Sequence, residues 1–186
     1  METIRHLDTD ELMAGLDHIL ASPKDCGTVH MIVRRPETDE REVCETAELD
    51  EKQGLVGDNW AARGSSRTGD GSAHPDMQLN LMNSRVVQLV ATSRDRWPLA
   101  GDQIFVDMDL SKENLPAGTR LQLGSAIIEV TAEPHAGCKK FVARFGLDAM
   151  KFVNSGLGKT HCLRGINAKV VQTGTFKVGD VAQRLD

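Results

Sequence analysis

The stretch "LAGDQIFVD" at residues 99–107 decides the fold, because a glycine and a polar residue lead directly into alternating apolar residues. The same order recurs in "LPAGTRLQLG" at 115–124 and in "KVGDVAQRL" at 177–185. Glycine reaches backbone dihedral angles that other residues resist, so each stretch predicts a tight turn into a strand. Repeated strands of this kind suit a closed or partly open β-barrel, in which closure leaves no sheet edge exposed.

Further strands are indicated by short apolar or alternating runs with polar turns between them. They are predicted at "GTVHMIVRR" (27–35), "REVCETAEL" (41–49), "MQLNLMN" (77–83) and "SAIIEVTAE" (125–133). A last hairpin is expected near the C-terminus, with its turn at 172–174. Together these runs predict a mainly β fold.

An amphipathic helix is expected at the N-terminus, over residues 9–20. Its apolar residues form one stripe, its first turn is acidic, and Asp8 or Thr9 can cap it. The polar stretch "ASPKDCG" at 21–27 then ends the helix before the first strand.

A second helical region is expected late in the chain, over residues 138–154, where Gly146 ends one helix and Asp148 caps another. The segment 84–93 fits a strand or a short helix, because periodicity alone does not separate the two. Residues 59–76 are rich in Gly, Ser and Asp, which predicts a long surface loop.

The length of 186 residues fits one domain with a sizeable core. No stretch has the composition of a linker between two domains. We therefore expect a single domain over 1–186, with a helical extension at 1–26 and a barrel core at 27–186.

Composition and charge narrow the class of protein. A net charge of -5 argues against a general nucleic-acid binder, which needs a basic surface to neutralise phosphates. The acidic residues near the N-terminus interrupt any apolar run, so neither a signal peptide nor a membrane anchor is expected, and a cytoplasmic location follows. The 4 cysteines contain no CxxC pair, so free thiols are expected in the reducing cytosol.

One cysteine stands out, Cys138 in "EPHAGCKKFVARFG" at 133–146. It precedes a helix and two lysines, and a helix start and ammonium groups both favour a thiolate. Lys139 supplies positive charge, and His135 supplies charge or accepts the proton. The alternative is a thiol packed against the apolar face of the same helix, and local sequence leaves both interpretations open.

Basic residues near Cys138 indicate an anion site. Arg144 and Arg164 are the strongest candidates, because each lies in an apolar or glycine-rich context and a guanidinium binds phosphate or carboxylate through two hydrogen bonds. A solvated helix face is the alternative for this charge. Asp58 in "GLVGDNW" is a further candidate ligand residue, although Asx residues after glycine usually form turns.

A zinc site made from two histidines and two cysteines is disfavoured. It would combine His135 and Cys138 with His161 and Cys162. Adjacent residues of a strand point to opposite faces, so His161 and Cys162 would not both reach one ion. We therefore expect no metal site formed by protein side chains alone.

Several of these motifs together resemble the MOSC domain, the domain named after the C-terminal part of molybdenum-cofactor sulfurases. The resemblance lies in "EPHAGCKKFVARFG", in "LRGINAKVVQTGTFKVGD" at 163–180, and in "QLNLMNSRVVQL" at 78–89. The resemblance extends from about Gly27 to the C-terminus, and the chain is similar to stand-alone bacterial members of the family.

The resemblance implies a β-barrel with one functional cysteine, Cys138. In the family this cysteine is thought to carry sulfur as a persulfide or, in amidoxime-reducing relatives, to ligate molybdenum. Arg144 and Arg164 match the family's arginines near the pocket. Pyridoxal phosphate belongs to an aminotransferase-like domain that this chain lacks, so sulfur would come from a cysteine desulfurase or another donor.

The sequence thus predicts a sulfur carrier or sulfurtransferase in which Cys138 forms a persulfide beside an anionic small-molecule ligand. One alternative is a protein or oxidoreductase that binds the molybdenum cofactor, with Cys138 as the metal ligand. Another is a binding module without catalysis.

Overall fold

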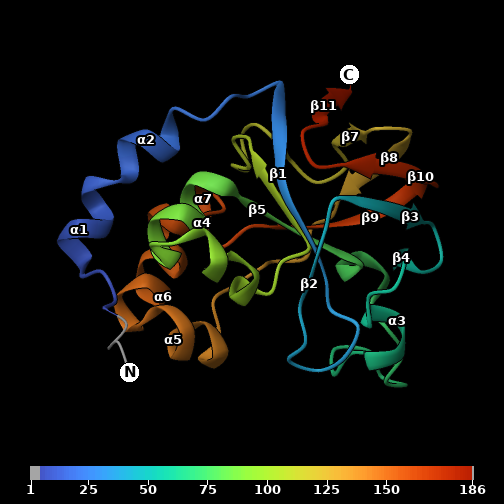
Figure 1. Cartoon of the computed structure of the whole chain (residues 1–186), viewed down its shortest axis with the longest axis horizontal. Coiled ribbons are helices and arrows are strands. Elements are labelled where there is room, and N and C mark those ends of the chain that lie inside the picture. The colour runs from blue at the N-terminus through green and yellow to red at the C-terminus, as the bar shows by residue number, and fades with distance from the viewer. Residues whose placement is uncertain (1–4, 186) are drawn as a thin grey trace.

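The computed structural model describes residues 5–185 (Figure 1). Its strands are β1 (Cys26–Arg34), β2 (Glu42–Cys44), β3 (Thr46–Asp50), β4 (Gly54–Leu55), β5 (Leu79–Asn83), β6 (Ile104–Asp107), β7 (Arg120–Leu123), β8 (Ala126–Val130), β9 (Ile166–Gln172), β10 (Gly174–Lys177) and β11 (Val181–Leu185). Its α-helices are α1 (Thr9–Ala14), α2 (Leu16–Leu20), α3 (Trp60–Arg63), α4 (Ser84–Ala91), α5 (Lys139–Phe145), α6 (Leu147–Asn154) and α7 (Gly156–Thr160). Two 3-10 helices, η1 (Pro75–Met77) and η2 (Arg94–Ala100), complete the set.

The predicted barrel is confirmed and is closed. Seven strands follow one another in the order β11-β7-β8-β9-β5-β6-β1, and β1 pairs again with β11. β5 and β6 are parallel, whereas the other neighbours are antiparallel. β2 continues the sheet beyond the barrel, and β10, β3 and β4 form a small separate sheet.

The three glycine turns predicted from the sequence precede barrel strands. Gly101, Gly118 and Gly179 have φ angles of 88°, 92° and 90° before β6, β7 and β11. These values lie in the left-handed region, which a side chain with a Cβ resists. The recurrence in the sequence therefore marks a real structural repeat of the barrel.

Two apolar clusters hold the fold together. The first fills the barrel and includes Val29, Leu81 and Ile104. The second lies between the outer face of the barrel and the helices, and it includes Val87 and Phe105. Figure 1 shows the same division, with α1, α2 and α4 to α7 gathered on one side of the barrel. All five residues of β5 are buried because both of its faces are covered.

The predicted N-terminal helix is confirmed but divides into α1 and α2 at Gly15. Asp8 is the cap: its side chain accepts from the Glu11 amide, and the Glu11 side chain accepts from the Asp8 amide. The glycine packs tightly, since a Cβ at this position would meet the side chain of Leu89. The first four residues of the predicted extension lie outside the described residues.

The late helical region predicted over 138–154 is confirmed as α5 and α6, and Gly146 ends α5 with a φ of 91°. The helix α7 follows and was not predicted. The predicted cap by Asp148 is wrong, because Asp148 lies within the first turn of α6. The ambiguous segment 84–93 contains α4, capped by the side chain of Asn83. The segment predicted as a loop, 59–76, includes the short helix α3.

Two predictions about the strands are wrong, one about the length of a strand and one about a pairing. The single strand expected over 41–49 breaks at Glu45 into β2 and β3, which belong to different sheets. The last hairpin does not form, because β10 pairs with β3 and β9 pairs with β5 and β8. Local sequence shows where a strand begins, whereas its partner depends on the packing of the whole barrel.

Across residues 5–185, no helix has the length and hydropathy needed to cross a membrane.

Candidate functional site

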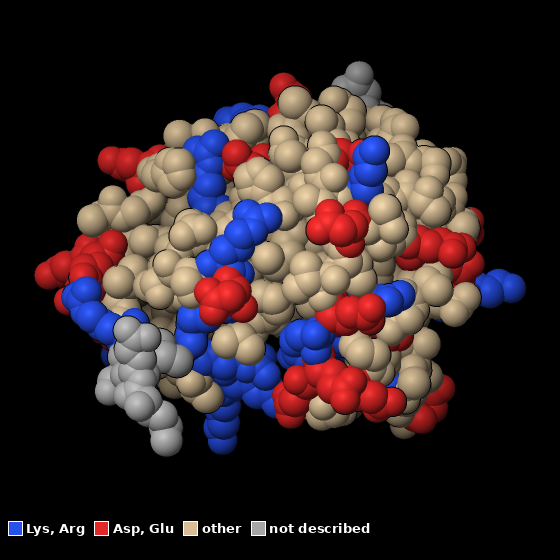
Figure 2. Space-filling view, in the orientation of Figure 1, with Lys and Arg blue, Asp and Glu red and all other residues tan. Residues whose placement is uncertain are grey.

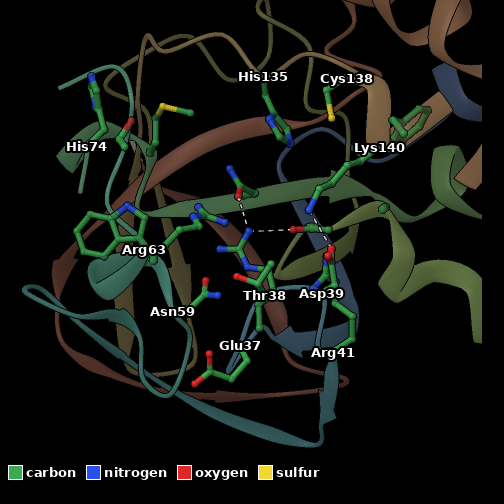
Figure 3. Close-up of a pocket in the computed structure, with 18 of the residues that line it drawn as sticks. Glu37, Thr38, Asp39, Arg41, Asn59, Arg63, His74, His135, Cys138 and Lys140 are labelled. Atoms are coloured by element: carbon green, nitrogen blue, oxygen red, sulfur yellow. Dashed lines mark hydrogen bonds and ion pairs between the residues drawn. The ribbon is translucent and has the colours of Figure 1, made fainter. Parts of the chain in front are cut away.

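A cavity of about 290 Å³ opens beside α5 (Figure 3). Segments far apart in the sequence build it: the β1–β2 loop, the start of α3, the turn before β6, the residues around Cys138, and Arg164. Six of the side chains that line it are basic: Arg35, Arg41, Arg63, Lys140, Arg144 and Arg164. The volume is at the small end of the range for small-molecule sites.

Cys138 lies at the wall of this cavity. It is the N-cap residue of α5, it is exposed, and its side chain makes no capping hydrogen bond. The preceding residue is fixed from α6, because the Gly137 amide donates to Asn154 Oδ1 at 2.8 Å and Asn154 Nδ2 donates to the Gly137 carbonyl at 3.0 Å. Figure 3 shows the sulfur pointing into the space that the basic side chains enclose. The thiol is therefore free to react with a bound molecule.

A buried carboxylate, Asp102, organises one side of the cavity. It lies 2.9 Å from His135 Nε2 and accepts a hydrogen bond of 2.6 Å from Arg164 Nη1. Burial by itself raises the pKa of Asp102, but Arg164 and His135 together lower it below its ordinary value. Burial, assisted by the charge of Arg164, lowers the pKa of His135. The arrangement holds an ionised Asp102 against a fixed His135 ring.

Arg164 lies at the floor of the cavity and is held there by three contacts. Besides Asp102, it donates through Nη2 to the Ala100 carbonyl at 2.9 Å and lies over the Phe141 ring at 5.1 Å from its centroid. Its Nε is buried and has no hydrogen-bond partner within the described part of the chain. A guanidinium in this position supports the wall of the cavity, and its positive charge is largely matched by Asp102.

Arg35 forms the other fixed cation of the floor. Asp58, whose side chain is fully buried, accepts from Nε and Nη2 of Arg35, each at 2.8 Å. Arg35 also donates through Nη1 to Asn80 Oδ1 and to the Gly101 carbonyl. Such a two-point pair fixes the plane of the guanidinium.

The cations nearer the mouth are less completely paired. Burial, followed by repulsion from Arg144, lowers the pKa of Arg41, and burial followed by repulsion from Arg35 lowers the pKa of Arg63. Among residues 5–185, neither Arg41 nor Arg63 forms an ion pair with a carboxylate. Positive charge is thus concentrated here beyond what the protein itself neutralises.

Unsatisfied polar atoms gather at the same place. Among residues 5–185 five buried side-chain atoms have no hydrogen-bond partner, and three of them belong to residues that line the cavity: Asn59 Oδ1, Trp60 Nε1 and Arg164 Nε. Buried polar atoms are nearly always paired in native proteins, so a group of orphans indicates a wall suited to a polar ligand.

Four of the six site residues predicted from the sequence line this one cavity: Cys138, His135, Arg144 and Arg164. Asp58 lies beneath the floor and acts through Arg35. Lys139 does not line the cavity, whereas its neighbour Lys140 does, because successive helical residues point in different directions.

Sequence reasoning missed the N-terminal half of the cavity. Arg35 and Arg41 lie in the charged run "RRPETDER" at 34–41, which resembled a polar turn. Asp102 lies in the stretch 99–107, which was interpreted only as a glycine turn into a strand, so no role in the site was predicted for it. The charged run was the signal that could have been found, since three basic residues, Arg34, Arg35 and Arg41, flank its turn.

The four residues of the disfavoured zinc set are not assembled. Cys138 lines the cavity described above, whereas Cys162 lines a second cavity of about 440 Å³, and only His135 borders both. His161 borders neither of these two. Within residues 5–185 no group of three or more His, Cys, Asp or Glu side chains is placed to hold a metal ion. Burial raises the pKa of the Cys162 thiol.

Comparison with known proteins agrees with the barrel and with the Cys138 region. Residues 68–183 match the family model of the MOSC domain. The chain belongs to the MOSC domain family. Cys138 and Arg164 lie within the matched part, whereas Arg35, Arg41 and Arg63 precede it. The cavity of this MOSC protein is therefore completed by residues outside the segment that defines the family.

Solved structures share this MOSC fold. YiiM from Escherichia coli has a TM-score of 0.54 and 18% identity, with 86% of this chain and 70% of that chain covered. The YUAD protein from Bacillus subtilis has a TM-score of 0.57 and 17% identity, with 85% and 96% covered. YiiM from Geobacillus stearothermophilus has a TM-score of 0.51 and 12% identity, with 86% and 73% covered. No curated protein matches the chain in sequence.

Proposed function

We propose that this MOSC protein is a sulfur carrier or sulfurtransferase in which Cys138 holds sulfur as a persulfide beside an anionic small-molecule ligand. The observation that carries the proposal is the position of Cys138, whose exposed side chain lines a cavity with six basic residues. A persulfide is an anion near neutral pH, and positive charge around it stabilises that form.

The proposed transfer has two balanced steps. In the first, the Cys138 thiolate attacks the outer sulfur of a donor persulfide, a new S–S bond forms, and the donor leaves as a thiolate. In the second, a nucleophilic acceptor takes the outer sulfur, and Cys138 leaves as a thiolate. No external oxidant or reductant is needed, because the sulfane sulfur passes from one thiol to the next.

The surrounding residues have separate roles in this proposal. Lys140 and Arg63 attract the anionic acceptor, while Arg164 and Asp102 keep the floor rigid. Asp102 also holds the His135 ring beside Cys138, and the lowered pKa of His135 favours a neutral ring that can accept a proton. The donor is a cysteine desulfurase or another protein that forms persulfides.

The test is persulfide loading followed by intact mass measurement. Wild type incubated with a low-molecular-weight persulfide is expected to gain the mass of one sulfur atom, and Cys138→Ala is not. Cys26→Ala is the matched control, because Cys26 is the other exposed thiol. Equal sulfur uptake by wild type and Cys138→Ala overturns the proposal.

A second candidate is binding of the molybdenum cofactor, and the unsatisfied atoms of Asn59, Trp60 and Arg164 favour it. The residues fit such a group: Cys138 offers a thiolate for the metal, and the basic residues at the mouth offer contacts for a phosphate. When bound, the cofactor would supply redox chemistry at molybdenum.

Metal analysis separates the two candidates. Protein purified from a host that makes the cofactor would contain molybdenum in wild type and less in Cys138→Ser. Molybdenum below the level found in an unrelated control protein argues against cofactor binding. A binding module without thiol chemistry predicts that Cys138→Ala binds anions as wild type does and that neither sulfur nor molybdenum is acquired.

A further inference from the structure

Two acidic residues, Glu37 and Asp39, line a cavity that is otherwise rich in basic side chains, and Asp39 pairs with two of these. Asp39 lines the mouth together with Arg41, Lys140 and Arg144. Its Oδ1 accepts hydrogen bonds from Lys140 Nζ at 2.9 Å and from Arg144 Nη2 at 3.3 Å. Figure 3 shows Asp39 and Lys140 reaching toward each other across the opening. The carboxylate therefore occupies the place that an anionic ligand would take between these two cations.

The two cations belong to one face of α5, because residues four apart on a helix lie on the same side. Arg144 is further fixed by donating through Nη1 to the Leu99 carbonyl at 2.8 Å. Asp39 comes from the loop between β1 and β2, about a hundred residues earlier in the chain. The contact consequently joins a loop to a helix across the mouth.

The charges on the two sides are opposite over a wider area. Between Arg35 and Arg41 the loop carries Glu37, Asp39 and Glu40, while the first turn of α5 carries Lys139 and Lys140. In Figure 2, basic and acidic side chains face each other across a hollow near these two elements. Asp39 thus offsets part of the positive charge that Lys140 and Arg144 place at the mouth.

The backbone of the loop suits a residue of this type. Asp39 has a φ of 63°, in the left-handed region that Asp and Asn tolerate better than most residues with a side chain. The Asp39 side chain is 60% exposed and that of Lys140 is 62% exposed. Exposed ion pairs are weak, so a ligand with more than one negative charge can displace the carboxylate.

We propose that Asp39 is an internal anion that competes with the ligand for Lys140 and Arg144, so that binding of a multiply charged anion releases the β1–β2 loop from α5. This inference rests on the anion site of the proposed function, and it adds a residue that sets the affinity and charge preference of that site. Lys140 and Arg144 attract a ligand with a single carboxylate about as strongly as they attract Asp39. They attract a phosphate-bearing ligand more strongly, because it carries an additional negative charge.

The experiment measures binding of inorganic pyrophosphate by isothermal titration calorimetry at low ionic strength. Asp39→Asn keeps the shape and the left-handed backbone but removes the charge, so its Kd is expected to fall by about threefold, the range of an exposed ion pair. Glu40→Gln is the matched control, since it removes one charge from the same loop without breaking a contact with α5. In a Lys140→Gln background the gain from Asp39→Asn is expected to shrink.

A second readout follows the loop itself. Pyrophosphate is expected to accelerate amide hydrogen exchange over residues 36–40 in wild type, because the loop is released. In Asp39→Asn the same residues exchange faster before pyrophosphate is added, and the further change is small.

The outcomes distinguish this inference from the site on which it rests. If pyrophosphate binds and Asp39→Asn lowers its Kd no more than Glu40→Gln does, the proposed competition by Asp39 is wrong and the anion site stands. Slower exchange over 36–40 on binding also overturns the release of the loop. If pyrophosphate binds to none of the proteins, the anion site itself fails, while persulfide formation on Cys138 is tested independently by mass measurement.

Discussion

At the scale of single residues, the cavity has two cations that are paired with buried carboxylates and others that are not. Arg35 and Arg164 form the floor, and each is matched by a buried carboxylate, Asp58 or Asp102. Removing one member of such a pair leaves a buried charge without compensation, which costs far more than the pair contributes. The cavity keeps its shape through these two pairs.

The first prediction concerns the buried pair. Asp102→Asn is expected to lower the free energy of unfolding at neutral pH by about 3 kcal/mol, because Arg164 remains charged and buried. Urea unfolding followed by circular dichroism measures the change. Asp180→Asn, at an exposed turn, serves as the control.

The loss of stability in Asp102→Asn is also expected to depend on pH. The pKa of Asp102 is lowered from its ordinary 3.8, so the stability that it contributes is present above pH 3.8 and is lost as the pH falls through the folded-state value. The stability difference between wild type and Asp102→Asn should therefore narrow in acid. A difference that stays constant or widens would mean that Asp102 is not ionised in the folded protein.

The second prediction concerns the thiol at the cavity. Cys138 is expected to react with iodoacetamide faster than Cys26 at neutral pH, because it lies at the N-terminal end of α5 and at the wall of a cavity lined by six basic residues, surroundings that raise the reactivity of a thiol. Mass spectrometry of the two peptides over time gives both rates in one sample. Added salt should slow Cys138 more than Cys26, and equal rates at both thiols would speak against an activated cysteine.

At the scale of elements, the site is built where strand turns meet α5. The carbonyls of Leu99, Ala100 and Gly101 each accept from an arginine, namely Arg144, Arg164 and Arg35. The turn that starts β6 thus fixes three cations of the cavity as well as the strand. Its glycine is necessary because the backbone at this point has a positive φ.

The third prediction compares two glycines of the barrel. Gly165, with a φ of 110°, lies beside the backbone of β5, and a Cβ would come 2.2 Å from the Leu81 carbonyl oxygen. Gly118 has a φ of 92°, but a Cβ would meet no atom within 4 Å. Gly118→Ala should cost about 1 kcal/mol from backbone strain alone.

Gly165→Ala should cost clearly more, because β9 must shift away from β5. Both values come from urea unfolding under the same conditions. Equal losses for the two variants would show that the close approach of β9 and β5 is relieved without cost.

At the scale of the whole molecule, two apolar layers share the barrel wall. Side chains of one face of each strand fill the barrel, and those of the other face meet the helices. Leu81 belongs to the inner layer and Leu12 of α1 to the outer one, and both are fully buried. Because one wall serves both layers, we expect them to unfold together.

The fourth prediction tests this cooperativity. Leu81→Ala and Leu12→Ala should each lower the free energy of unfolding by about 2–5 kcal/mol, the usual cost of a core cavity. Far-UV circular dichroism and the fluorescence of the tryptophans should give coincident transitions in wild type and in both variants. An earlier, separate transition in Leu12→Ala would instead make the N-terminal helices an independent unit.

Much of the strand pattern was contained in local sequence. The glycine turns before β6, β7 and β11 were predicted correctly because a positive φ leaves a direct trace in the choice of residue. Cys138, His135, Arg144 and Arg164 were found because they cluster in the chain or match a family motif. The partner of β10, the break at Glu45 and the contributions of Arg35 and Arg63 were missed, since they depend on contacts between distant segments.

The sequence by itself determined a β-barrel, closed or partly open, with glycine turns and a cysteine at the start of a late helix. Only the tertiary structure decided that the turn at 99–102 serves the site, with its carbonyls and Asp102 holding arginines from three different segments. The physical reason is that a buried guanidinium needs acceptors on several sides, and a single stretch of chain does not supply them. Pairing across the barrel brings these acceptors together.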